Sequence, residues 1–200
     1  MQDEQVIALV QQSLKENVPA RSILENGLIP GMKKVGELFK NKQYYVPEVL
    51  LASEAFYAGF NIVQPLLKSE KVSQRGKVVI GVVHGDIHDI GKNIVKVMIE
   101  ATGVTVIDLG KDIPAEKFIT AVAEEKPDIL ALSSLMTTTM PCMAEIIQEL
   151  EQRRLRNAVK VIIGGAPVTA EYAEQIGADA FGGDAAEAIS IINDILHGPH

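Results

Sequence analysis

The sequence predicts an α/β protein made of an N-terminal four-helix bundle and a doubly wound, five-stranded parallel sheet. Three observations carry this prediction. Apolar residues recur at helical spacing as far as Leu67, short apolar runs alternate with helical stretches after residue 77, and a polar stretch at residues 68–77 separates the two patterns. We therefore expect a helical domain at residues 1–68, a linker at 69–76 and an α/β domain at 77–200.

The first 67 residues predict four helices. Pro19 and Pro30 each stand where a helix could begin, because proline is favoured in the first helical turn. Asn41 is a plausible helix end, and Pro47 opens a longer helix that runs through Leu67. Two of the apolar stripes are Val6, Leu9, Val10 and Leu14, and Met32, Val35, Leu38 and Phe39. A helical bundle of this size is marginally stable alone.

The pattern after the polar stretch is that of strands buried on both faces. Residues 78–83 form a continuous run rich in β-branched side chains, which is typical of a central parallel strand. Further strands are expected at 104–109, 129–133, 159–163 and 178–181, and helices at 93–101, 114–125, 140–154, 170–176 and 185–196. This alternation predicts a flavodoxin- or Rossmann-like sheet, in which ligands bind at the carboxyl ends of the strands.

Composition excludes several classes of function. The net charge of −7 argues against a nucleic acid or an anionic membrane as the main partner, and 4% aromatic residues leave little surface for stacking bases. The single Cys142 cannot form an internal disulfide or a cysteine-rich metal site. No apolar run approaches the length of a membrane span and no leader pattern opens the chain. We expect a cytoplasmic protein with no nucleic-acid and no membrane partner.

The loop after the first predicted strand, residues 84–93, concentrates polar side chains. His88 has a carboxylate two residues away in Asp86, an arrangement typical of a metal-ligating imidazole, although an ordinary helix-start histidine is the alternative. The loop contains neither the phosphate-loop nor the dinucleotide-binding glycine pattern, so both nucleotide hypotheses are disfavoured. Lys92 and Asn93 are expected on the solvated surface of the helix that follows.

Two later loops are expected at the same edge of the sheet. Residues 133–139 follow the third strand and are rich in hydroxyl groups, and a glycine pair follows the fourth strand. Both are ordinary turn compositions, but paired glycines also allow a flat ligand to approach the backbone.

Taken together, the three loops resemble the cobalamin-binding family. The family signature of D-x-H-x-x-G, S-x-L and G-G is matched by Asp86, His88 and Gly91, by Ser133 and Leu135, and by Gly164 and Gly165. The three parts are separated by 41 and 28 residues, which also suits the family. The segments at residues 31–39 and 45–49 resemble the four-helix cap before the cobalamin domain in methionine synthase and in small corrinoid proteins of methanol, methylamine and methoxyaromatic methyltransferase systems.

The resemblance implies a cobalamin bound base-off/His-on, with His88 as the lower axial ligand of cobalt and Asp86 holding the far nitrogen of that imidazole. It implies that Thr139 extends this pair with a hydroxyl. The detached nucleotide tail would lie in a slot beside the sheet, lined by Ser133, Thr137 and the Gly164-Gly165 turn. Cap residues expected near the upper face are Met32, Tyr45, Val46 and Leu50, for which plain bundle core is the alternative.

The function implied by the resemblance is that of a methyl carrier, which is not an enzyme by itself. It would accept a methyl group on Co(I) from a substrate-specific methyltransferase and deliver it from methyl-Co(III) to an acceptor methyltransferase that uses tetrahydrofolate or a thiol, with a reductive activase as a further partner. The alternatives are the small subunit of an adenosylcobalamin-dependent mutase and a cobalamin-responsive regulatory protein. A phosphorylated receiver domain is a weaker alternative, because Asp108 alone does not make its acidic cluster. The sequence leaves the methyl donor open.

Overall fold

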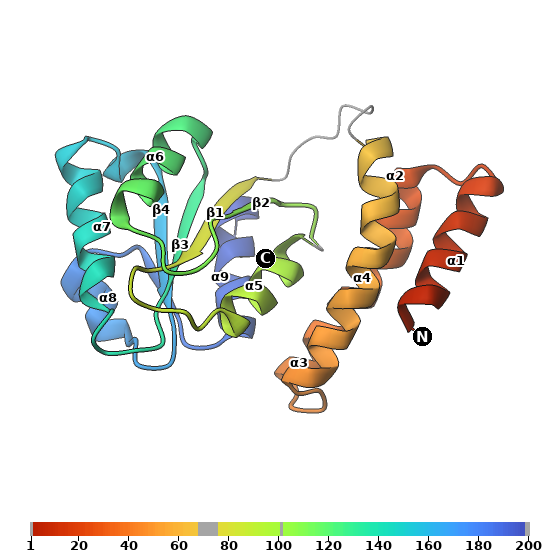
Figure 1. Cartoon of the computed structure of the whole chain (residues 1–200), viewed down its shortest axis with the longest axis horizontal. Helices are drawn as coiled ribbons and strands as arrows, with labels where there is room; N and C mark the ends of the chain where they lie inside the picture. The colour runs from red at the N-terminus through yellow and green to blue at the C-terminus, as the bar shows by residue number, and fades with distance from the viewer. Residues whose placement is uncertain (1, 68–75, 101, 199–200) are drawn as a thin grey trace. The chain divides into compact units, whose positions relative to one another are not determined.

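The computed structural model describes residues 2–67, 76–100 and 102–198, and within them the chain forms two compact units. One is helical, and the other contains the sheet (Figure 1). The predicted linker at residues 69–76 lies outside the described residues, except for Gly76.

The helical unit contains α1 (Gln2–Lys15), α2 (Ala20–Ile23), the π-helical turn η1 (Leu24–Leu28), α3 (Ile29–Lys40) and α4 (Val46–Leu67). As expected, Pro19 precedes α2 and Asn41 ends α3. Pro30 stands in the first turn of α3, as expected, although the backbone stays helical from α2 through η1 into α3. A widened π-turn just before Pro30 accommodates a residue without a backbone N–H in a continuing helix.

Apolar side chains from several of these helices are buried within the unit. They include Val10, Ile23, Met32, Val49, Phe56 and Val63. Gly59 of α4 allows side chains of α1 and η1 to approach the α4 backbone closely, since a Cβ atom there would lie 2.8 Å from Val6 and 2.9 Å from Leu28. The rings of Phe56 and Phe60 stack with centroids 5.5 Å apart.

The second unit is built on a five-stranded, all-parallel sheet, so the predicted fold class is confirmed. Its strands are β1 (Lys77–Val82), β2 (Thr105–Asp108), β3 (Ile129–Ser133), β4 (Lys160–Gly164) and β5 (Ala180–Gly182), in the order β2-β1-β3-β4-β5. Strand order reverses between β1 and β3, and such a reversal is where open parallel sheets bind ligands.

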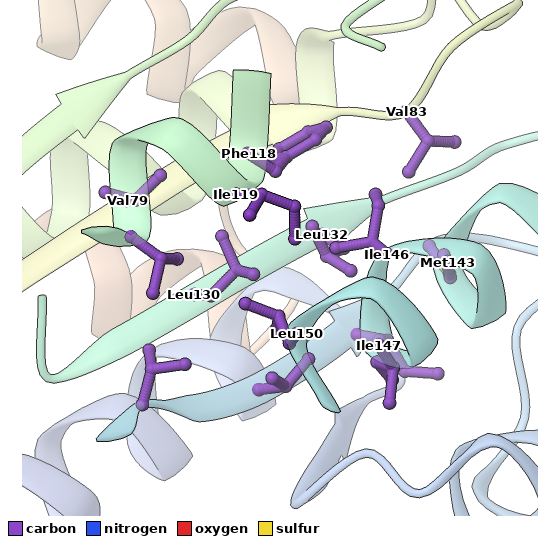
Figure 2. Close-up of a cluster of buried hydrophobic side chains, with 14 of the residues drawn as sticks. Val79, Val83, Phe118, Ile119, Leu130, Leu132, Met143, Ile146, Ile147 and Leu150 are labelled. Atoms are coloured by element: carbon purple, nitrogen blue, oxygen red, sulfur yellow. The ribbon is translucent and has the colours of Figure 1, made fainter. Parts of the chain in front are cut away.

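Helices cover both faces of this sheet (Figure 1). The helices α5 (Ile90–Glu100) and α9 (Ala185–His197) lie on one face, and α6 (Ala115–Glu125), α7 (Pro141–Gln152) and α8 (Ala170–Ile176) lie on the other, with a short 3₁₀ turn η2 (Arg156–Ala158) before β4. Because successive strand residues point to opposite faces, Val78 and Ile80 pack with Ile99 and Ile192, whereas Val79 packs with Phe118. Figure 2 shows the larger of the two cores, in which α6 and α7 meet β3. None of the described helices combines the length and the apolar character that crossing a membrane requires.

Charged residues of alternating sign mark the amino ends of four neighbouring strands. The carbonyl of Lys77 in β1 accepts a hydrogen bond from the backbone N–H of Asp128. The N–H of Lys77 in turn donates to the carboxylate of Asp128 at 2.8 Å. The N–H of Lys160 donates to the carbonyl of Asp128, and its ammonium lies 2.8 Å from the carboxylate of Asp179, which precedes β5. The sequence of charges across β1, β3, β4 and β5 is therefore plus, minus, plus, minus.

Candidate functional site

The loops after β1, β3 and β4 converge at one edge of the sheet. Val82 pairs with Ser133 and Ser133 pairs with Gly164, so these three strands end side by side. Beside them lies a cavity of about 480 Å³, within the range of small-molecule sites. Predicted site residues that line it are His88, Gly91, Ser133, Leu135, Gly164 and Gly165. Aliphatic side chains line its deeper wall, among them Ile80, Val95, Ala131, Ile162 and Ile192.

Asp86 and His88 form a close pair, of which His88 lines this cavity. Nδ1 of His88 lies 2.7 Å from Oδ1 of Asp86, and the backbone N–H of His88 donates to the same oxygen at 2.9 Å. Asp86 is fully buried, whereas the His88 side chain is 48% exposed. Burial by itself would raise the pKa of Asp86, but hydrogen bonds from the N–H groups of His88 and Leu135 outweigh it and hold that pKa below its usual value.

The loop after β3 completes the surroundings of the Asp86 carboxylate. The backbone N–H of Leu135 donates to Oδ2 at 2.6 Å, and the hydroxyl oxygen of Thr139 lies 3.3 Å from the same oxygen. The structure thus brings Asp86, His88 and Thr139 together, as the resemblance to the cobalamin-binding family implies. Thr137, on the same loop, is exposed.

This arrangement fixes the chemistry that His88 offers. An ionised Asp86 accepts a hydrogen bond at each oxygen and therefore assigns the proton of the neutral imidazole to Nδ1. Nε2 then carries the free lone pair, and no hydrogen bond to it comes from the described part of the chain. A lone pair on a cavity-lining imidazole whose other nitrogen is held by a buried carboxylate fits a metal-bound cofactor that needs one ligand from the protein.

Gly165 allows the two later loops to meet. Its φ is +133°, and a Cβ atom at this position would lie 1.7 Å from the carbonyl oxygen of Ser134. The N–H of Ser134 also donates to the carbonyl of Gly164 at 3.1 Å. Only glycine combines this backbone conformation with so close an approach.

A fourth loop, after β2, contacts the Asp86–His88 loop through Asp112, a residue that the sequence analysis did not single out. The carboxylate of Asp112 accepts a hydrogen bond from the N–H of Gly85 at 2.7 Å and lies 2.8 Å from Nδ1 of His84, while its own N–H donates to the carbonyl of Asp86 at 3.0 Å. Asp112 adopts a positive φ of 57°. The sequence did carry a sign of this role: Asp112 follows the strand next to β1, so it was expected at the same edge of the sheet as Asp86.

The expectation of a solvated Lys92 is wrong. Its side chain is only 2% exposed, and its ammonium lies 2.6 and 2.7 Å from the two carboxylate oxygens of Asp108 at the end of β2. Lys96 adds a contact at 3.2 Å and the N–H of Gly110 donates to Asp108 at 2.9 Å. The first turn of α5 lies against the carboxyl end of β2, which buries this lysine beside the cavity that it helps to line.

The predicted cap residues differ in their surroundings within the helical unit. Met32 is buried, as the alternative of plain bundle core predicts, and Val46 is the first residue of α4. Tyr45 and Leu50 are large side chains left 64% and 38% exposed.

Comparison with known proteins gives consistent matches along the chain. Two family profiles, each described as a B12 binding domain, match residues 1–64 and 76–192. A trimethylamine corrinoid protein of Methanosarcina acetivorans is 39% identical over 197 residues, which is 97% of this chain and 91% of that protein. A corrinoid protein of Desulfitobacterium hafniense is 39% identical over 198 residues, with 97% and 92% covered.

Among solved structures, the methanol:cobalamin methyltransferase complex of Methanosarcina barkeri contains a chain that matches with a TM-score of 0.87 at 31% identity, covering 98% of this chain and 75% of that one. A cobalamin-binding protein of Desulfitobacterium hafniense matches with a TM-score of 0.74 at 33% identity, covering 96% and 92%.

Proposed function

The chain belongs to the family of B12-binding corrinoid proteins, and from this membership we propose that it carries a corrinoid-bound methyl group between two methyltransferases. The observation that carries the proposal is the buried Asp86 on Nδ1 of His88, which leaves Nε2 free on a side chain that lines the cavity. When bound, the cofactor supplies a cobalt centre that accepts and releases a methyl group.

His88 is the proposed lower axial ligand, in the base-off/His-on mode. Asp86 supports this role because a carboxylate on Nδ1 fixes the ring orientation and makes Nε2 a stronger donor. Thr139, through its hydrogen bond to Oδ2, completes the proposed triad.

The cavity is the proposed site of the detached nucleotide tail. Ser133, Gly91 and the Gly164-Gly165 turn lie along it, and the aliphatic deeper wall suits a flat base without charge. The glycines matter here because side chains at these positions would narrow the cavity.

We propose residues 1–68 as the cap domain, 69–76 as its linker and 77–200 as the cobalamin-binding domain. Tyr45 and Leu50 are proposed as cap contacts, and their exposure leaves a large part of each side chain available to a ligand. Met32 and Val46 are proposed beside them.

The proposed partners are a substrate-specific methyltransferase, an acceptor methyltransferase and a reductive activase. The relatives named above support methyltransferase partners, since one solved match is part of a methanol:cobalamin methyltransferase complex. The methyl-transfer active sites would lie on those partners. The mutase and regulator alternatives are not favoured, because the relatives that match 97% of the chain are corrinoid proteins, among them one named for trimethylamine.

Reconstitution with cobalamin tests the proposal. We expect one cofactor per chain and, in the Co(II) form, axial ¹⁴N hyperfine splitting in the EPR spectrum that persists when the benzimidazole of the cofactor is labelled with ¹⁵N. His88→Ala should abolish this splitting. His84→Ala is the matched control, because His84 lies on the same loop outside the Asp86–His88 pair. A ¹⁵N pattern in the wild-type protein would refute His88 ligation, and the absence of cofactor binding would refute the function.

A further inference from the structure

Two buried hydroxyl groups lie behind the Asp86–His88 pair. The hydroxyl oxygens of Ser134 and Thr139 are 2.8 Å apart, and both residues are almost completely buried. Thr139 reaches Asp86, whereas Ser134 makes contact with Thr139 and with the carbonyl oxygen of Met136 at 3.1 Å. Ser134 is therefore one hydrogen bond further from the imidazole, and no role is assigned to it by the triad proposed above.

The direction of these hydrogen bonds follows from counting acceptors. The Met136 carbonyl already accepts backbone N–H groups from Thr139 at 3.1 Å and from Met140 at 3.3 Å, which uses both of its lone pairs. The hydroxyl oxygens of Ser134 and Thr139 lie 3.1 and 3.0 Å from the same carbonyl, but each would be an additional donor to an oxygen that already accepts two N–H groups.

The Asp86 carboxylate, in contrast, has one acceptor position that only Thr139 fills among the residues that the structure describes. Its two oxygens offer about four lone-pair sites. Three are used by the backbone N–H and Nδ1–H of His88 and by the N–H of Leu135. The fourth contact is the Thr139 hydroxyl, and a buried carboxylate is a much stronger acceptor than a neutral hydroxyl.

We propose that Ser134 is a positioning residue, whose hydroxyl donates to Oγ1 of Thr139 so that the Thr139 proton is directed to Asp86. The relay then runs from Ser134 through Thr139 and Asp86 to Nδ1 of His88. The reverse order, in which Thr139 donates to Ser134 and Ser134 to Met136, leaves a buried carboxylate lone pair without a donor and is disfavoured. As an account of axial-ligand tuning, this inference rests on the proposed function.

The relay sets how strongly Asp86 holds the imidazole proton. A hydroxyl that accepts a hydrogen bond becomes a better donor, so Ser134 strengthens the bond from Thr139 to Asp86. That bond draws electron density away from the carboxylate and weakens its attraction for the Nδ1 proton of His88. Loss of Ser134 should therefore tighten the Asp86–His88 hydrogen bond through Thr139.

The relay can be measured by NMR on the cofactor-free protein labelled with ¹⁵N-histidine, at a pH where the imidazole is neutral. In Ser134→Ala the His88 Nδ1 proton resonance should move downfield, and in Thr139→Val it should move further in the same direction. The double variant should match Thr139→Val alone. Thr138→Val is the matched control, because it removes an exposed hydroxyl from the same loop and should leave the resonance in place.

Two results would overturn the inference: an unchanged resonance in Ser134→Ala, or shifts that add in the double variant, which would mean that Ser134 acts independently of Thr139. Neutron diffraction of the wild-type protein provides a test that needs no variant. A deuteron on Ser134 directed at Thr139 is expected, and one directed at Met136 would contradict the relay. Because both measurements are made without cofactor, failure to bind cobalamin would refute the proposed function and leave the relay standing.

Discussion

Replacing Asp108 by asparagine should destabilise the α/β unit far more than replacing its partner Lys92 by methionine. Asp108→Asn removes the counter-charge 2.6 Å from an ammonium whose side chain is 2% exposed, and stranding a buried charge costs about 3–5 kcal/mol. Lys92→Met removes the buried cation itself and keeps most of its volume. Asp108 then retains Lys96 and the N–H of Gly110, so we expect a loss of about 1–2 kcal/mol. The gap of about 2 kcal/mol is roughly a 30-fold difference in the unfolding equilibrium constant.

Amide hydrogen exchange in the central strands is the appropriate assay. The chain has two compact units, so a single unfolding curve need not be two-state, whereas exchange of buried amides in β1 and β3 reports opening of the sheet alone. Lys117→Met, at an exposed lysine of α6, is the matched control and should change stability by no more than about 0.5 kcal/mol. Equal losses in the two variants, or a larger loss in Lys92→Met, would refute the argument from burial.

The stability difference between wild type and Asp108→Asn should also depend on pH, in a direction set by the pKa of Asp108. Burial alone would raise the pKa of Asp108, but the hydrogen bond and charge of Lys92 and the N–H of Gly110 outweigh it and lower that pKa. The stabilisation is therefore present above the ordinary aspartate pKa of about 3.9 and is lost as the pH falls through the lower folded value. The difference between wild type and Asp108→Asn should shrink in acid, and a constant difference down to acid unfolding would contradict this.

Two further predictions concern the loops that line the cavity. Gly165→Ala should cost more than about 3 kcal/mol, because the new Cβ atom meets the Ser134 carbonyl at a positive φ, and a thermal midpoint within a degree of wild type would contradict this. Asp184→Ala should cost about 1 kcal/mol in urea unfolding, because the Asp184 carboxylate caps α9 by accepting the N–H of Glu187 at 2.8 Å, and Asp184→Ser should restore most of the loss.

The fold could be predicted from the sequence because each strand and helix is indicated by a pattern within its own residues. The β-branched run at residues 78–83 predicts a buried strand by itself, and β1 occupies Lys77–Val82. The later strands were predicted to within two residues at each end for the same reason. The π-turn before Pro30 was not predicted, since a widened turn leaves no mark on apolar periodicity.

Contacts of the candidate site could be predicted from the sequence only where the two residues are close along the chain or belong to a family motif. Asp86 and His88 are two residues apart, so their hydrogen bond follows from spacing. The Lys92–Asp108 pair joins two elements 16 residues apart, and only the packing of α5 against β2 reveals it. The burial of Lys92 could have been predicted, since Lys92 lies seven residues before the apolar Ile99 and therefore on the same face of the helix.

The alternating charges at the amino ends of the strands bear on how the chain avoids misfolding. The strands β1, β3 and β4 are apolar segments with buried faces, and such segments aggregate readily when exposed during folding. In the native order each of these strands begins beside a charge of opposite sign. If β4 paired with β1 in place of β3, Lys160 would be brought beside Lys77, and two neighbouring copies of β3 would bring together two Asp128 carboxylates. Repulsion between like charges would therefore oppose the wrong strand neighbours both within one chain and between chains.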